Sequence, residues 1–238
     1  MRMALFIAWL LLPLGFAAWH YGPGQKEIKV DEAADSLAQA EKKIQSEDFA
    51  GACELYQEAL KTLPEDKVSQ RRAIQLALNK SQMRDGKLPE ASQDLKNLVE
   101  EISADQSADP ALLDETRSAL AQSQYYMTWL MRLEGIAQDE WEPEVDSARQ
   151  NYRLLAEQAE ARGDQAAAKS YQEDLESTIR LARMNLDELQ SISLPKQCCS
   201  CCSGKCNSKG KKPGKQPKQR PSDSRSAGTG PPPDGSGH

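Results

Sequence analysis

Apolar residues recur every three to four positions along most of this 238-residue chain. The pattern extends from about residue 31 to residue 192, and Ala, Leu, Glu, Gln, Lys and Arg dominate it. These residues favour helices, and a period of three to four positions is typical of a helix with one buried face. No stretch alternates with period two for long enough to indicate a strand. The pattern therefore predicts an all-α body of about seven antiparallel helices.

The first 20 residues follow a different pattern. Arg2 precedes an apolar run over residues 3–19 that contains no charged side chain. A basic residue before an apolar run is typical of a secretory signal peptide. As a helix, this run would measure about 25 Å, which is short for a hydrocarbon core of about 30 Å. We expect an apolar helix over residues 1–20 that is either a cleaved signal peptide or a retained membrane anchor, followed by a linker over residues 21–30.

The charges on either side of this apolar segment predict its orientation. Arg2 lies before the segment, whereas the residues that follow it are acidic (Glu27, Asp31, Glu32 and Asp35). Basic residues tend to stay on the cytoplasmic side of a membrane. We therefore expect an exported or membrane-anchored protein whose N-terminal segment contacts the membrane. Its body is expected outside the cytoplasm, in the periplasm or cell envelope.

Within the body, three stretches show related spacings. The stretch 33–66 has the clearest spacing, formed by Ala52, Tyr56, Ala59 and Pro64. The stretch 72–105 places similar residues at corresponding positions, namely Leu78, Gly86, Leu88, Ala91, Leu95 and Leu98. A more degenerate stretch near 149–182 contains Tyr152, Leu155, Ala156, Gly163, Ala168 and Leu175. Alanine lets two helices approach closely, and a glycine allows the tight turn between them.

These spacings resemble the tetratricopeptide repeat (TPR), a helical hairpin of about 34 residues, in an exported or membrane-anchored bacterial form. Asn79 and Gln172 depart from the pattern, since a small residue and an aromatic residue are usual there. The resemblance implies an α-solenoid whose first helices line a groove that binds a peptide or a helix of another protein. By repeat position, the side chains facing this groove include Leu37, Glu41, Ile44, Lys80, Met83 and Arg84. They do not reproduce the Lys/Asn clamp of chaperone-tail binders.

The region between the repeats predicts further helices. A long helix over about 110–133 carries so many large apolar residues in its second half that we expect burial on more than one side. Gly135 is expected to end it, a loop to occupy residues 136–142, and Pro143 to lie in the first turn of the next helix. A last helix over 164–192 is expected to cap the stack, and the alternative is that it pairs with a partner helix.

Charge and composition set the C-terminal 46 residues, 193–238, apart from the body. The chain has a net charge of −6, but residues 196–238 alone carry nine Lys or Arg against two Asp or Glu, which leaves the rest strongly acidic. Lys, Pro, Gly and Ser dominate this tail, and such a composition cannot bury enough apolar surface to fold, so we predict disorder. We expect no nucleic-acid binding, because the body is acidic and no aromatic residue of the tail is available to stack on bases.

The cysteines raise an alternative function. Five of the six lie in the tail, at Cys198, Cys199, Cys201, Cys202 and Cys206. Their C-x-x-C spacings suit metal binding or redox chemistry, although a second ligand pair at a distance is missing. The sixth, Cys53, is expected to be a small core residue.

The sequence contains no recognisable catalytic motif. Its two histidines, His20 and His238, both lie outside the predicted body, and there is no glycine-rich phosphate loop. We therefore expect no enzymatic activity and no cofactor. The favoured hypothesis is a non-enzymatic scaffold that binds another protein, and the alternative is a thiol- or metal-binding protein that acts through the cysteine cluster.

Overall fold

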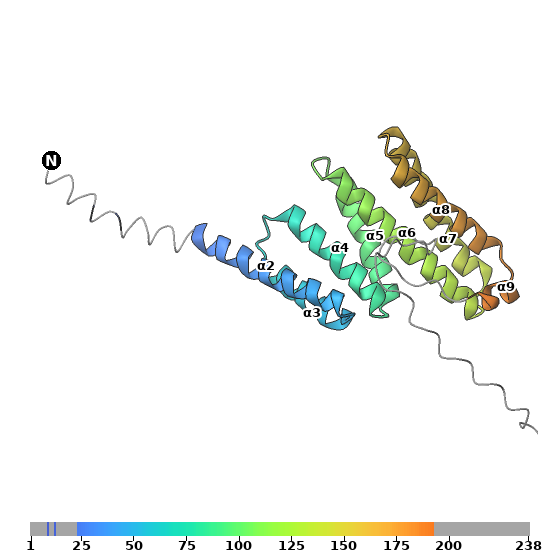
Figure 1. Ribbon diagram of the computed structural model, residues 1–238, viewed down its shortest axis with the longest axis horizontal. Coiled ribbons are helices and arrows are strands. Elements are labelled where there is room, and N and C mark those ends of the chain that lie inside the picture. The colour runs from blue at the N-terminus through green and yellow to red at the C-terminus, as the bar shows by residue number, and fades with distance from the viewer. Residues whose placement is uncertain (1–8, 10–11, 13–22, 193–238) are drawn as a thin grey trace, which may run out of the picture. The chain divides into compact units, whose positions relative to one another are not determined.

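The computed structural model describes Trp9, Leu12 and residues 23–192 (Figure 1). Within this part of the chain the fold is all-α and contains no strand, as the periodicity predicted. The helices are α2 (Pro23–Gln45), α3 (Phe49–Thr62), α4 (Val68–Arg84), α5 (Leu88–Ala104), α6 (Pro110–Leu133), α7 (Gln138–Ala161), α8 (Gln165–Arg183) and α9 (Leu186–Ser191).

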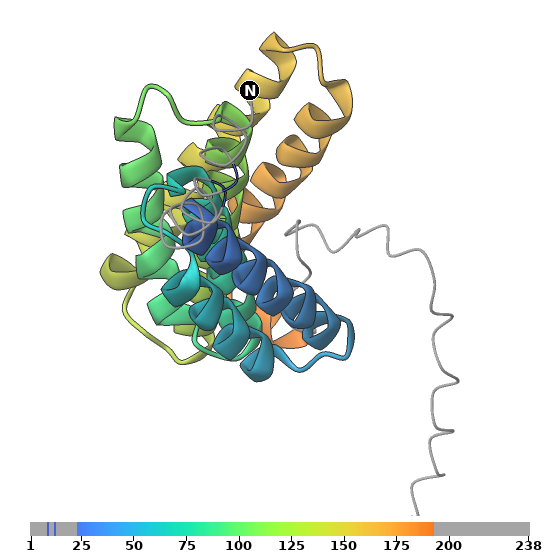
Figure 2. The same ribbon diagram turned by 90° about the vertical axis from the view of Figure 1, so that its left-hand side faces the viewer.

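The described helices pack mainly in chain order. Each helix from α2 to α7 contacts the next one, α4 also contacts α6, and α9 contacts α6. Figure 1 shows this succession of neighbouring helices, and Figure 2 shows it with the α2 end toward the viewer. Helices α2 to α8 therefore bury their apolar stripes mainly against their neighbours in sequence, as expected for stacked hairpins, whereas α9 packs on α6.

Four of the turns between helices share one geometry. In each turn one residue has a left-handed backbone: Glu47 (φ 62°), Gly86 (φ 84°), Gly135 (φ 75°) and Gly163 (φ 77°). The N–H of the following residue donates to the carbonyl five residues before it, with an N···O distance of 2.9 Å in all four turns. This is the Schellman motif that ends many helices. It turns the chain back on itself between α2 and α3, α4 and α5, α6 and α7, and α7 and α8.

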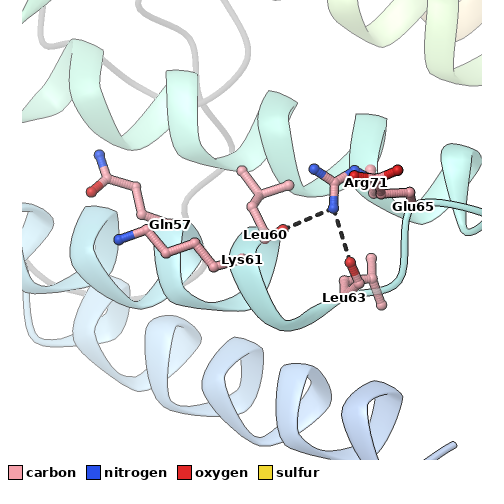
Figure 3. Close-up of a pocket in the computed structure, with 6 residues that line it drawn as sticks. All are labelled: Gln57, Leu60, Lys61, Leu63, Glu65 and Arg71. Carbon is pink, nitrogen blue, oxygen red and sulfur yellow. Dashed lines mark hydrogen bonds between the residues drawn. The ribbon is translucent and has the colours of Figure 1, made fainter. Parts of the chain in front are cut away.

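The connection between α3 and α4 is closed in another way. The Arg71 guanidinium of α4 donates from Nη1 to the Leu60 carbonyl at 2.8 Å and to the Leu63 carbonyl at 2.9 Å (Figure 3). Both carbonyls belong to the end of α3, where helices leave acceptors without an intrahelical donor. Arg71 thus replaces the missing donors and ties the two helices together.

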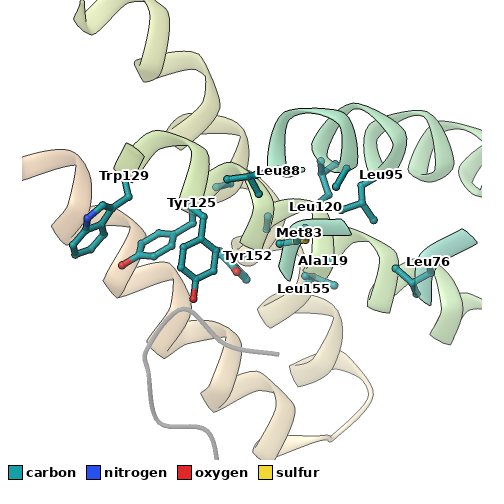
Figure 4. Close-up of a cluster of buried hydrophobic side chains, with 14 of the residues drawn as sticks. Leu76, Met83, Leu88, Leu95, Ala119, Leu120, Tyr125, Trp129, Tyr152 and Leu155 are labelled. Atoms are coloured by element: carbon teal, nitrogen blue, oxygen red, sulfur yellow. The ribbon is translucent and has the colours of Figure 1, made fainter. Parts of the chain in front are cut away.

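The apolar core is divided into two clusters. The smaller one joins α2, α3 and the near side of α4, and it contains the buried residues Ala40, Ala52, Tyr56 and Ile74. The larger one extends from α4 to α9 (Figure 4) and includes Leu95, Tyr126, Tyr152 and Leu155.

The large residues of α6 behave as predicted over most of the helix. Tyr125, Tyr126 and Trp129 are buried, and every residue from 119 to 126 is buried. The prediction does not extend to the last turn, where Leu133 is 37% exposed.

Two helix starts differ from those expected. Helix α2 begins at Pro23, so residues 23–30 of the expected linker are helical. Proline suits a first helical position because its missing N–H would have no intrahelical partner there. Helix α7 begins at Gln138, so most of the expected 136–142 loop is helical and Pro143 lies inside the helix at the cost of one hydrogen bond.

The predicted helix over 164–192 is two helices. Helix α8 ends at Arg183, and Asn185 starts α9 with a capping box, in which it exchanges hydrogen bonds with Glu188. The Arg132 guanidinium of α6 donates to the carbonyls of Leu181 and Met184 at the end of α8. Leu181 and Leu189, on either side of the break, are both fully buried. The apolar stripe therefore continues across the break, and periodicity alone predicted one helix.

The predicted N-terminal and C-terminal segments lie almost entirely outside the described residues. Of the apolar run only Trp9 and Leu12 are described; both are helical and exposed. Among the described residues, no helix is both long enough and apolar enough to cross a membrane. The predicted disorder of 193–238 lies outside the described residues as well.

Candidate binding groove on helix α4

Helix α4 is partly exposed on two opposite faces. The two sides between these faces are buried: Ile74 and Leu78 belong to the smaller core cluster, and Leu76 and Met83 belong to the larger one. At about 100° per residue, Lys80 and Arg84 lie about 140° and 180° around the helix from Gln75. The face predicted to bind a partner and the face around Gln75 are therefore on different sides of α4.

On the predicted face, both cations already have partners. The Lys80 Nζ lies 2.6 Å from the Glu115 Oε1 of α6. The Arg84 guanidinium lies over the Phe49 ring of α3, 3.9 Å from its centroid. These contacts tie α4 to its neighbours and reduce the charge that the two residues offer to a ligand.

The apolar residues predicted for that face are partly or fully packed. Met83 is only 4% exposed and belongs to the larger core cluster. Leu37 and Ile44 of α2 are half-buried against the smaller cluster, whereas Glu41 is exposed. The structure thus leaves Glu41 and the edges of Leu37 and Ile44 accessible there.

The opposite face of α4 is hollowed. Two hollows, of about 420 Å³ and about 320 Å³, share Leu60, and together we call them the α3–α5 groove. The larger one is lined by Gln57, Leu60, Lys61, Leu63, Glu65 and Arg71 (Figure 3). The smaller one is lined by Leu60, Gln75, Leu78, Asn79, Asp94, Asn97, Leu98 and Glu101. The smaller hollow lies between α3, α4 and α5, and the larger one lies along α3 with Arg71 of α4 at its side.

Asn79 is the most informative residue of the smaller hollow. Only 3% of it is exposed, yet no hydrogen bond of its carboxamide is found within the described part of the chain, and its polar atoms are not enclosed. Since Asn79 lines the hollow, the small exposed part of the side chain faces it. The sequence had marked this position only as a departure from the repeat pattern, which was the signal that could have led to the site.

The α5 wall of the groove is acidic. Asp94 is exposed and makes no ion pair within the described residues, and Glu101 accepts from the Arg72 Nε at 2.9 Å. The same arginine donates from Nη1 to the Asp105 Oδ2 at 2.7 Å. Hydrogen bonds from Ser107 and Arg72 lower the pKa of Asp105 to about 2. Arg72 is therefore shared between two carboxylates, and Asp94 is left to face solvent.

The predicted thiol or metal residues lie elsewhere. Cys198, Cys199, Cys201, Cys202 and Cys206 are all outside the described residues. Over residues 23–192, no group of three or more His, Cys, Asp or Glu residues is arranged to hold a metal ion. Cys53 is buried in the core as predicted, and burial raises the pKa of its thiol.

Comparison with known proteins assigns no family to this chain. No protein-family model matches it, and no curated protein matches it either. The helical packing and the α3–α5 groove are therefore the features that bear on its function.

Proposed function

We propose that this protein is a non-enzymatic scaffold that binds a segment of another protein, and that its hairpins form a TPR-like α-solenoid. Three of the four left-handed turns support the repeat. A buried alanine follows the left-handed residue by five positions in each: Ala52, Ala91 and Ala168. A small residue at the same place after each turn lets successive helices pack at the same close distance.

The observation that carries the binding function is the α3–α5 groove. It combines an apolar base, formed by Leu60, Leu78 and Leu98, with several polar side chains around it. This combination is typical of ligand sites, where apolar surface provides affinity and a few polar groups orient the ligand. Solenoids use such extended surfaces to bind other chains.

The cellular location is part of the same proposal. Arg2 and the apolar run over 3–19 favour export or membrane anchoring, with the helical body outside the cytoplasm. In the sequence, α2 begins at Pro23, only a few residues after that run. A retained segment would therefore hold the scaffold close to the membrane.

Site-specific photo-crosslinking in cells tests this function. A photo-reactive residue is placed in the full-length protein at Gln57 in the groove, at Glu41 on the face predicted from the repeat, or at Lys169 on α8 as a control. All three positions are exposed. We expect crosslinked protein adducts at Gln57 or Glu41 that do not form at Lys169. Identical adducts at all three positions, or none at Gln57 and Glu41, would contradict it.

A further inference from the structure

In the smaller hollow of the α3–α5 groove, Asn79 places a carboxamide that has no hydrogen-bond partner among the described residues. A polar group that is almost completely buried normally has a hydrogen-bond partner in the protein. Asn79 has none among the described residues, and the leucines around it (Leu60, Leu78 and Leu98) supply no side-chain donor or acceptor. The NH₂ donor and the C=O acceptor of the Asn79 side chain are therefore available to a molecule that enters the hollow.

We propose, on the basis of the protein-binding function above, that this groove binds an extended peptide segment that carries lysine or arginine. A carboxamide has one acceptor and an NH₂ donor group, so it can pair with the N–H and C=O of a peptide main chain. In a helix these main-chain groups are bonded to one another, whereas an extended segment leaves them free. Asn79 thus selects an extended ligand and holds its main chain.

The acidic side chains of α5 favour a ligand with basic side chains. Glu90, Asp94 and Glu101 are four and seven residues apart, so they lie along one stripe of α5, and Asp94 and Glu101 line the hollow. Because Arg72 already neutralises part of Glu101, Asp94 is the main free charge. On the α3 side, Arg71 is held by two carbonyls. A cationic side chain is therefore attracted toward α5.

The size of the hollow limits how much of the ligand is recognised. A volume of about 320 Å³ is at the lower end of the range for small-molecule sites. It accommodates a short stretch of chain, with the aliphatic stem of a lysine or arginine on the leucine base and its charge beside Asp94. The neighbouring hollow of about 420 Å³, which shares Leu60, continues the path along α3.

The test measures peptide binding to the full-length protein by fluorescence anisotropy. The probe is a labelled Pro-Lys-Val-Lys-Pro peptide, in which the prolines keep the chain extended. Two comparison probes replace both lysines by glutamate, or place the same lysines in an alanine-rich helical peptide. We expect the extended basic probe to bind best, and its binding to weaken as salt is added.

Two variants and one control locate the binding. Asn79→Ala removes the carboxamide and restores the small residue usual in the repeat, and it is expected to weaken binding about 5- to 10-fold. Asp94→Asn is expected to weaken it about 3-fold and to reduce its salt dependence. Glu100→Gln makes the same change of charge on α5, about 120° around the helix from Asp94, and is expected to leave binding unchanged. Circular dichroism verifies that each variant is folded.

Several results would overturn the inference. Unchanged binding by folded Asn79→Ala and Asp94→Asn would do so, as would equal binding of the acidic probe. Tighter binding of the helical probe would mean that the groove accepts a helix instead. If no probe binds while crosslinks at Gln57 persist, this inference fails and the scaffold function stands. If a probe binds but no protein is crosslinked in cells, the scaffold function fails.

Discussion

Replacing Glu47 by glycine is expected to stabilise the protein. Glu47 ends α2 with φ at 62°, while the equivalent positions of the other three Schellman turns are glycines. A left-handed backbone costs a residue with a Cβ about 1–2 kcal/mol. The Glu47 side chain is exposed and makes no hydrogen bond within the described residues, so its removal loses little.

The magnitude follows from two opposing effects. Glycine relieves the left-handed strain, but it also gives the unfolded chain more freedom, which lowers stability by about 0.4–1 kcal/mol. The difference predicts a gain of about 0.5–1 kcal/mol for Glu47→Gly. Gly86→Ala is the converse change, and nothing lies within 4 Å of the added Cβ. It should therefore lose about the same amount, because the same two effects oppose each other and the added Cβ meets no steric obstacle.

Urea unfolding of the full-length protein, followed by circular dichroism, measures both changes as shifts of the midpoint at constant slope. Glu157→Gly is the matched control, because it makes the same replacement at an exposed position within α7. Inside a helix, glycine is unfavourable by about 1 kcal/mol, so this variant should be destabilised. A lower midpoint for Glu47→Gly, or an unchanged midpoint for Gly86→Ala, would refute the reasoning.

Three further predictions concern the core, the pH dependence and the tail. Leu95→Ala removes a side chain that is fully buried in the larger cluster and should lower the free energy of unfolding by about 2–5 kcal/mol in urea titrations. The pKa of Asp105 is about 2 in the folded protein, below its ordinary value of 3.8. Its ionised carboxylate therefore stabilises the fold fully above about pH 3.8, and this stabilisation is lost as the pH falls through about 2. The stability difference between the wild type and Asp105→Asn should therefore narrow between about pH 4 and pH 2 and be constant near neutral pH. Changing the five tail cysteines to serine should leave the metal content measured by mass spectrometry unchanged; more metal in the wild type would favour the thiol or metal hypothesis.

The helical class was predictable because it depends on local residue pattern. Stripes of apolar residues predicted the all-α body, the burial of Cys53 and the wide buried surface of α6, since each reflects a period that any helix imposes. Glycine positions likewise predicted tight turns at Gly86 and Gly163, both of which have a left-handed backbone. Glu47 was missed as the equivalent residue of the first turn because glutamate carries no sequence signal for a left-handed backbone.

Helix boundaries were predicted less well because distant residues contribute to them. The break between α8 and α9 is stabilised by Arg132, which lies 49 residues before the Leu181 carbonyl that it contacts. No local pattern contains that hydrogen bond. The apolar stripe continued through the break, since Leu181 and Leu189 are buried on both sides of it.

The sequence alone determined that the chain forms stacked helical hairpins, because helix periodicity and turn glycines act over a few residues. Only the tertiary structure decided which face of α4 is open. Lys80 and Arg84 looked available in the sequence, but Glu115 and Phe49 engage them once α3, α4 and α6 are packed. Asn79 looked like an irregularity of the repeat, and packing turned it into a buried carboxamide beside a hollow. Whether a side chain is available to a ligand depends on the helices packed around it, and the tertiary fold determines which helices these are.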